Sequence, residues 1–223
     1  MKILVIDIGG NNVKALISGE TERRKFPSGA ELTPQQMVHG IHEIVSQGEY
    51  DHVSIGFPGP VKNNRPTKEP VNLGLGWVDF DYEKAFNCPV RMINDAAMQA
   101  LGSYDGDDML FLGLGTGLGT ALIYNGYAIP MELGHLPYKK NKSFEDYLGS
   151  AGQKRLGVKK WKQQVLTVIK ILVAAFGPEY VVLGGGNSKK FTMEELPENI
   201  RLGDNINAFV GGFRLWETQG RDK

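Results

Sequence analysis

The chain has one cysteine, no excess of charge of either sign and no long apolar run. Cys88 is the single cysteine among 223 residues, so no internal disulfide and no cysteine-based metal site can form. The 25 basic and 25 acidic residues cancel, so net charge does not favour nucleic acid or membrane as a partner. The apolar run that ends at Asp7 is too short for a signal-peptide core, and no apolar stretch reaches membrane-spanning length. These features favour a reducing compartment, and we expect a cytoplasmic protein.

Glycine is abundant, and it is gathered in short motifs rather than in a low-complexity tract. There are 29 glycines, several of which directly follow apolar runs. Glycine at such places permits tight turns and close approach of a backbone to a ligand. The chain length suits one large or two small domains.

Apolar runs alternate with helical patterns, which predicts an α/β fold. Thr33-Pro34-Gln35-Gln36 indicates a helix start, with Thr33 as the N-cap and Gln36 as its reciprocal partner. We expect strands at 3–6, 13–17, 22–26, 53–56, 90–93, 109–114, 120–124 and 180–183, and helices from 33, at 96–101, 144–155, 163–176 and 205–216. The residues between 61 and 76 are expected to form a long loop.

The two halves of the chain begin alike. Each has a strand, a glycine turn and a second strand, first around residues 7–10 and again around residues 115–119. We interpret this as an internal duplication of architecture.

The first glycine motif is Asp7-Ile8-Gly9-Gly10-Asn11-Asn12, which closes a predicted hairpin. Glycines there let backbone N–H groups approach an oligophosphate, and Asp7 adds a carboxylate for Mg²⁺ or its bound water. A plain hairpin turn explains the same residues without any ligand.

Two further glycine motifs also follow strands. Gly115-Thr116-Gly117-Leu118-Gly119 has a hydroxyl between glycines, and Gly184-Gly185-Gly186 stands at a strand end, where α/β sheets bind ligands. Each motif alone is weak, but three in equivalent positions together indicate phosphate binding.

Asn94-Asp95 also ends a predicted strand. A carboxylate there can accept a proton from a substrate hydroxyl while the amide holds a neighbouring one. The alternative is that Asp95 is only the N-cap of the following helix.

Glu132-Leu133-Gly134-His135 places an acid and an imidazole three residues apart, which suits recognition of sugar hydroxyls. A zinc site is the competing interpretation, and it lacks further histidine or cysteine ligands. His39 and His42 are interpreted as helix-surface residues for the same reason.

Together these motifs resemble, in their order, those of the ROK family of sugar kinases and repressors. The resemblance spans about residues 3 to 190, and Gly56-Phe57-Pro58-Gly59-Pro60-Val61 belongs to it. The short chain, and Glu132-Leu133-Gly134-His135-Leu136 without a zinc motif, look most like the polyphosphate glucokinase branch. No helix-turn-helix segment precedes Met1, so the repressor branch is disfavoured.

The resemblance implies an actin-like ATPase (ribonuclease H-like) fold of two lobes with a cleft between them. We expect lobes at 1–96 and 97–223, with the last helix packing back on the first lobe. It implies that Asp95 is the general base, and that hexose hydroxyls are bound by Asn94, Glu132, His135, Glu145 and Asn72. The resemblance also implies that Mg²⁺ is held by Asp7. The residues it implies for binding the phosphoryl donor are Asp7, Gly9, Gly10, Asn11, Lys14, Gly115, Thr116, Gly117, Gly184, Gly185 and Gly186.

The implied donor is ATP or inorganic polyphosphate, and the implied assembly is a homodimer. Two departures from the family pattern stand out: Asn11 replaces the usual threonine, and the cysteine-rich zinc motif is missing, so no zinc is expected.

A basic stretch adds a local positive field. It consists of Lys139, Lys140, Lys142, Lys154, Arg155, Lys159, Lys160 and Lys162, opposed by Glu145 and Asp146 alone. We hypothesise that it guides polyphosphate, whereas the simpler alternative is a solvated helix face.

Three other functions remain open at this point. The chain could be a sugar sensor that has lost turnover through Asn11, or a kinase for an N-acetylated amino sugar or a small acid. It could also be a structural subunit of a larger assembly.

Overall fold

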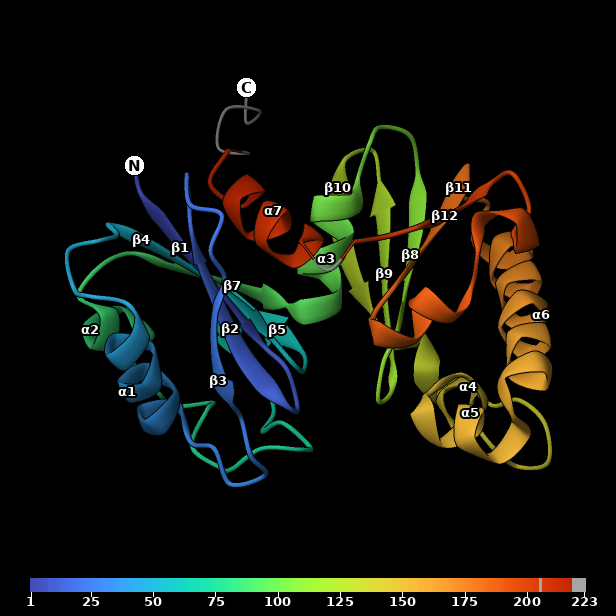
Figure 1. Ribbon diagram of the computed structural model, residues 1–223, viewed down its shortest axis with the longest axis horizontal. Helices are drawn as coiled ribbons and strands as arrows, with labels where there is room; N and C mark the ends of the chain where they lie inside the picture. Colours follow the sequence, from blue (N-terminus) through green and yellow to red (C-terminus); the bar gives the residue numbers. More distant parts are fainter. Residues whose placement is uncertain (205, 218–223) are drawn as a thin grey trace. The chain divides into compact units, whose positions relative to one another are not determined.

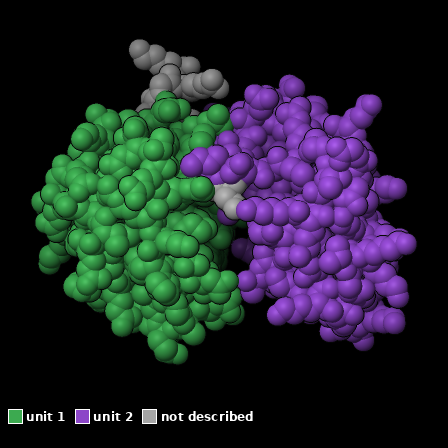
Figure 2. Space-filling model, viewed as in Figure 1, with its two compact units in different colours: residues 1–98, 208–223 green, residues 99–207 purple. Residues whose placement is uncertain are grey.

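The computed structural model describes residues 1–204 and 206–217 (Figure 1). The chain divides into two compact units, which are coloured separately in Figure 2. Unit 1 comprises residues 1–98 and 208–223, and unit 2 comprises residues 99–207. Within the described residues, none of the helices is long and apolar enough to cross a lipid bilayer.

Unit 1 is built on a five-stranded mixed sheet with the strand order β3-β2-β1-β4-β7. The antiparallel part consists of β1 (Ile3–Ile8), β2 (Asn12–Ile17) and β3 (Arg24–Pro27). The parallel part adds β4 (His52–Phe57) and β7 (Val90–Asn94) to β1. The carboxyl ends of β1, β4 and β7 therefore meet at one edge of the sheet, because Asp7 pairs with Gly56 and Phe57 pairs with Asn94.

One face of this sheet carries the main core of unit 1. Leu4, Ile6, Val53 and Ile55 pack there against α1 (Pro34–Ile44) and α2 (Tyr82–Phe86). The expected start of α1 is confirmed, because Thr33 and Gln36 form a reciprocal capping box.

The opposite face of the same sheet is contacted by the start of α3 (Asp95–Ser103) and by α7 (Asn207–Arg214). Alternation along the strands turns Val5, Ser54 and Gly56 to this side. A Cβ at Gly56 would overlap Met98 of α3, and a Cβ at Gly212 of α7 would overlap Val5. These two glycines let the helices lie directly on the strands.

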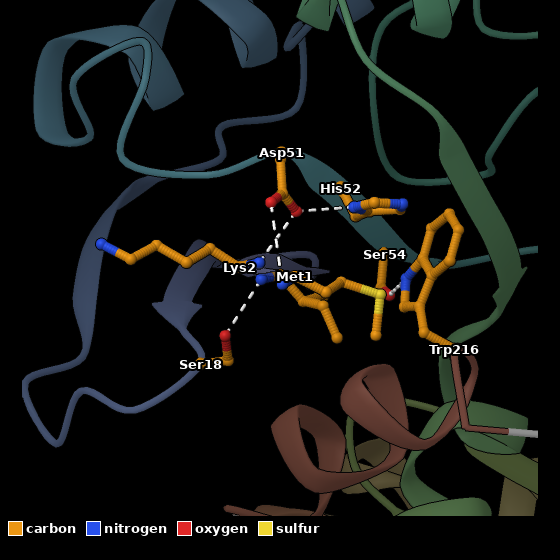
Figure 3. Close-up of polar contacts among 8 residues, drawn as sticks. Met1, Lys2, Ser18, Asp51, His52, Ser54 and Trp216 are labelled. Atoms are coloured by element: carbon orange, nitrogen blue, oxygen red, sulfur yellow. Dashed lines mark hydrogen bonds and ion pairs between the residues drawn. The ribbon is translucent and has the colours of Figure 1, made fainter.

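A polar cluster fastens the end of the described chain to unit 1. Ser54 Oγ donates to the carbonyl of Gly212 at 2.6 Å and accepts from Trp216 Nε1 at 2.8 Å. Figure 3 shows Trp216 beside Ser54 and His52, with Asp51 holding His52 and the backbone N–H of Lys2. The helix expected at 205–216 is thus observed at 207–214, and residue 205 lies outside the described residues.

Unit 2 repeats the same sheet plan, with the strand order β10-β9-β8-β11-β12. Its antiparallel part is β8 (Met109–Leu114), β9 (Leu118–Tyr124) and β10 (Tyr127–Met131), and β11 (Tyr180–Gly184) and β12 (Ile200–Leu202) extend it in parallel. Each sheet is a three-stranded antiparallel meander followed by two parallel strands. The internal duplication expected from the two glycine turns is confirmed by this topology.

The core of unit 2 lies between its sheet and three helices, α4 (Phe144–Leu148), α5 (Ser150–Leu156) and α6 (Val158–Phe176). Trp161 of α6 is fully buried and donates its indole N–H to the carbonyl of Leu148 at 2.8 Å. The single helix expected at 144–155 is wrong. It is broken at Gly149, after which the backbone N–H of Ser150 turns to the carbonyls of Gly115 and Thr116.

Several short elements had no clear pattern in the sequence. They are α2, β10, β12, the small hairpin β5 (Val61–Lys62) and β6 (Arg65–Pro66), and the 3-10 helices η1 (Leu133–His135), η2 (Gly186–Lys190) and η3 (Met193–Glu195). All are too short to display a hydrophobic period.

Candidate functional site

The first glycine turn joins β1 to β2 in unit 1, and Asp7 stands one residue before the end of β1. Asp7 is 6% exposed, and Lys14, its cross-strand partner on β2, places Nζ 3.0 Å from its carboxylate. A carboxylate this buried needs a positive or hydrogen-bonding partner to stay charged. Lys14 was predicted to lie near the phosphoryl donor, and in the structure its side chain contacts Asp7.

Ser28 braces this turn, although no sequence motif singled it out. Its hydroxyl donates to the carbonyl of Gly9 at 2.5 Å, and its backbone N–H donates to the carbonyl of Asn11 at 3.1 Å. Ser28 is buried, whereas Gly10 and Asn11 are exposed. The turn is therefore fixed from below and open on its outer side.

Asn94 and Asp95 stand at the same sheet edge, two strands away from Asp7. Helix α3 begins at Asp95, so the N-cap is Asn94, whose Oδ1 accepts from the N–H of Ala97 at 3.1 Å. Asn94 Nδ2 donates to the carbonyl of Gly59 at 3.1 Å, and the residue is 8% exposed. The N-cap role that was the alternative for Asp95 is thus filled by Asn94. Asp95 is half-buried, and its Oδ1 accepts from the N–H of Ala96 at 2.8 Å.

The loop after Pro60 contains the predicted hexose-binding residue Asn72, which is exposed. Trp77, which could have stacked on a sugar, is instead fully buried beside Phe57 and donates its indole N–H to the carbonyl of Gly74 at 2.8 Å. Trp77 is therefore a core residue that fixes the loop.

In unit 2, the second glycine turn joins β8 to β9 and is held through the carbonyl of Gly115. That oxygen accepts from the backbone N–H of Ser150 at 3.1 Å, from Ser150 Oγ at 2.9 Å and from Asn187 Nδ2 at 3.1 Å. Asn187 also donates to Ser150 Oγ at 3.1 Å. The start of α5 and the segment after β11 are thereby both tied to this turn.

Glu145 packs against the same turn from α4. Its Oε2 accepts from the N–H of Leu118 at 2.9 Å, and a Cβ at Gly117 would overlap its carboxylate. A side chain at position 117 would therefore displace the carboxylate of Glu145. The structure thus joins a predicted hexose-binding residue to a predicted phosphate-binding turn.

The third glycine motif follows β11, which is the parallel neighbour of β8. Its glycines and the turn at 115–119 therefore leave the sheet at the same edge. Gly185 has φ +78° and lies so close to β8 that a Cβ would be 2.6 Å from the carbonyl oxygen of Leu114. Gly186, by contrast, is exposed, and a Cβ added there would meet no neighbouring atom within 4 Å.

Glu132 and His135 lie at the two ends of η1. Their side chains are 59% and 72% exposed, and His135 Nε2 is 3.6 Å from Glu132 Oε2. Leu133 and Gly134 between them are buried. The side chains of Glu132 and His135 are thus exposed to solvent, while the residues between them pack against the protein.

A magnesium ion held jointly by protein and substrate needs few protein ligands. Among the described residues, no group of three or more His, Cys, Asp or Glu could enclose a metal ion. Magnesium is commonly held by one or two carboxylates together with substrate phosphates and water, and Asp7 is the carboxylate predicted for this role.

The structure gathers the predicted residues other than Asn72 into two sets, each at the carboxyl edge of one sheet. The set in unit 1 is Asp7, Gly9, Gly10, Asn11, Lys14, Asn94 and Asp95. The set in unit 2 is Gly115, Thr116, Gly117, Glu132, His135, Glu145, Gly184, Gly185 and Gly186. The bracing residues Ser28, Ser150 and Asn187 were missed, because single hydroxyl and amide residues carry no motif.

Comparison with known proteins shows the family of this chain. The model of the ROK family matches residues 3–155. Polyphosphate glucokinase of Mycobacterium tuberculosis (strain ATCC 25618 / H37Rv) is 27% identical over 206 residues, covering 83% of this chain and 77% of that protein. Glucokinase of Pyrobaculum calidifontis is 25% identical, covering 89% of this chain and 85% of that protein.

Solved structures share the fold over nearly the whole chain. The inorganic polyphosphate/ATP-glucomannokinase of Arthrobacter sp. strain KM superposes with a TM-score of 0.81 at 24% identity, covering 98% of this chain and 99% of that one. A ROK family glucokinase of Streptomyces griseus, solved with glucose and AMPPNP, gives a TM-score of 0.75 at 18% identity, covering 96% and 99%. The family match, the relatives and the shared actin-like ATPase fold together show that this chain is a phosphotransferase of the ROK family.

Proposed function

We propose that this protein is a hexose kinase that transfers a phosphoryl group from ATP or polyphosphate to the 6-hydroxyl of glucose or a related hexose. The observation that carries the proposal is the placement of Asn94 and Asp95 at the junction of β7 and α3. Asn94 takes the N-cap of α3 and anchors Gly59, and Asp95, the first residue of α3, stands at the sheet edge that also carries the first glycine turn. A carboxylate positioned in this way suits a general base.

The chemical step needs positioning and charge neutralisation more than covalent catalysis. Asp95 accepts the proton of the hexose hydroxyl as that oxygen attacks the terminal phosphorus. The glycine turns at 9–10 and 115–117 bind phosphate oxygens through their backbone. Asp7 would hold magnesium, which supplies neutralisation of phosphate charge when bound.

Hexose recognition is assigned to several polar side chains. Glu132 and His135 are exposed and can bind sugar hydroxyls directly. Asn94 keeps one amide hydrogen beyond its bond to Gly59, and Asn72 is exposed. Glu145 has a second carboxylate oxygen besides the one bound to Leu118.

The proposal that polyphosphate serves as a phosphoryl donor rests on the start of α6. Gly157 is its N-cap without a side-chain cap, and Lys159 and Lys160 are exposed in its first turn. Neither lysine has an ion pair among the residues that the structure describes. Cations at a helix N-terminus add to the positive end of its dipole, so a polyanion is favoured there.

Lys162 does not belong to this basic surface. It is bound to both carboxylate oxygens of Glu195, at 2.6 and 2.7 Å, and its side chain is 19% exposed. The proposal that polyphosphate is bound therefore leaves out Lys162, together with Lys139, Lys142 and Arg155, whose side chains also have described partners. The enzyme is further expected to be a cytoplasmic homodimer, and sedimentation of the purified protein would test the assembly.

The decisive experiment supplies glucose and Mg²⁺ with either ATP or polyphosphate and follows glucose 6-phosphate through a coupled dehydrogenase. Product from either donor is expected. A panel including mannose and N-acetylmannosamine then separates a glucokinase from an amino-sugar kinase. Absence of product throughout the panel, with glucose still binding in calorimetry, would replace the kinase by a sugar sensor.

A further inference from the structure

A buried threonine lies beneath the turn that carries Glu132 and His135. Thr120 is on β9, directly opposite Met131, the last residue of β10. Thr120 is 1% exposed. Its position places a hydroxyl where the chain leaves the sheet and enters η1.

This hydroxyl bonds to the backbone on both sides of Glu132. Thr120 Oγ1 donates to the carbonyl of Met131 at 2.6 Å and accepts from the N–H of Leu133 at 3.1 Å. Glu132 itself lies between these two groups, with φ −110° and ψ 45°, and its side chain makes no cap bond for η1. The backbone of Glu132 is therefore fixed by Thr120, and the carboxylate of Glu132 is left for other partners.

The same strand supports the rest of the turn. Leu118, two residues before Thr120 and on the same face of β9, places its carbonyl oxygen 3.0 Å from where a Cβ on Gly134 would be. The N–H of Leu118 holds Glu145. This end of β9 thus contacts the backbone next to Glu132 and His135 and the side chain of Glu145.

We propose that Thr120 is a positioning residue for hexose recognition, acting through the backbone of Glu132 and the orientation of η1. The proposal rests on the proposed function, because it needs Glu132 and His135 to bind the hexose. Valine has nearly the shape of threonine but can make neither bond, so it would release the carbonyl of Met131 and leave the buried N–H of Leu133 without its described acceptor.

The test compares Thr120→Val with Thr120→Ser, using Thr167→Val as a matched control. The hydroxyl of Thr167 bonds to the carbonyl of Gln163 on the exposed side of α6. Thr120→Val is expected to raise the hexose KM by about tenfold or more and to leave the donor KM within about twofold. Thr120→Ser, which keeps the hydroxyl, is expected to have the hexose KM of the wild type. Thr167→Val is expected to leave both KM values unchanged.

Hydrogen–deuterium exchange of the peptide covering residues 131–136 gives a second readout that needs no catalysis. Exchange is expected to quicken in Thr120→Val and to return to the wild-type rate in Thr120→Ser. If Thr120→Val does not fold, Thr120→Ala replaces it in both comparisons.

An unchanged hexose KM in the valine variant would overturn the proposal, as would an equal rise in both KM values or unaltered exchange. A wild-type protein that phosphorylates no hexose would instead defeat the proposed function. In that case the exchange comparison still decides whether Thr120 holds the turn.

Discussion

Lys14 Nζ lies 3.0 Å from the carboxylate of Asp7, and the two residues are direct cross-strand partners in the hairpin that carries the first glycine turn. Asp7 is almost fully buried, whereas 43% of the Lys14 side chain is exposed. The buried carboxylate therefore holds the lysine beside the predicted phosphate site, where the lysine stays accessible to an anion.

Lys14→Met is expected to destabilise the protein, because it leaves the buried carboxylate of Asp7 without its cation. Partial exposure of Lys14 limits the loss to about 1–2 kcal/mol of unfolding free energy. Urea denaturation of Lys14→Met, Asp7→Asn and the double variant measures the coupling. Strictly additive losses would show that the pair contributes nothing.

Asp95→Asn is expected to lower kcat by about 10²- to 10⁴-fold, because the amide cannot accept the hydroxyl proton. Hexose affinity, measured by calorimetry, should stay close to that of the wild type. Asp79→Asn, an exposed acid of unit 1, is the matched control and should retain full turnover. A turnover loss below about threefold in Asp95→Asn would remove the assignment of the base.

Asn94→Ala should reduce stability as well as activity. It removes the N-cap bond from Ala97 and the bond to the carbonyl of Gly59, for an expected loss of about 1–2 kcal/mol. Thermal unfolding checks this, with Asn199→Ala, an exposed asparagine of unit 2, as control. Equal melting temperatures for the two variants would contradict the capping role.

Lys159→Ala combined with Lys160→Ala is expected to raise the KM for polyphosphate and to leave the KM for ATP unchanged. The effect should shrink at high salt, since it arises from exposed charge. Lys62→Ala with Lys68→Ala, an equal charge change on unit 1, serves as control. A matching rise in both donor constants would count against a polyphosphate-binding surface.

Stability should fall as the pH is lowered through the range just below the usual histidine value. Burial, with a smaller contribution from His39, lowers the pKa of His42 from 6.5. The unfolded chain therefore binds more protons than the folded chain in that range, and protonation favours unfolding. His42 lies against the Phe86 ring and 3.4 Å from the Tyr50 hydroxyl.

Urea unfolding at about pH 7.5 and about pH 5.5, on either side of the usual histidine pKa, measures this dependence in the wild type and in His42→Gln. The variant should lose less stability between the two values. His39→Gln, which removes the smaller contribution alone, should keep most of the wild-type loss. If His42→Gln lost as much stability between the two pH values as the wild type does, the pH dependence would arise from other groups.

Features that depend on near neighbours in the chain could be predicted from the sequence alone. The strand–glycine–strand units, the Thr33–Gln36 capping box and the duplication all follow from local geometry and from the hydrophobic period. The ROK family motifs were likewise recognisable because each is a contiguous run of residues.

Which polar groups are engaged with one another was settled by the tertiary fold. Trp77 could not be assigned to core or ligand from the sequence, and the break at Gly149 depends on the carbonyls of Gly115 and Thr116, which lie far from Ser150 in the chain. Other polar residues also have partners set by the meeting of distant segments, namely Asn94, Lys162, Ser28 and Thr120. A buried polar group must find a partner wherever the fold provides one, and the order of residues along the chain does not show where that is.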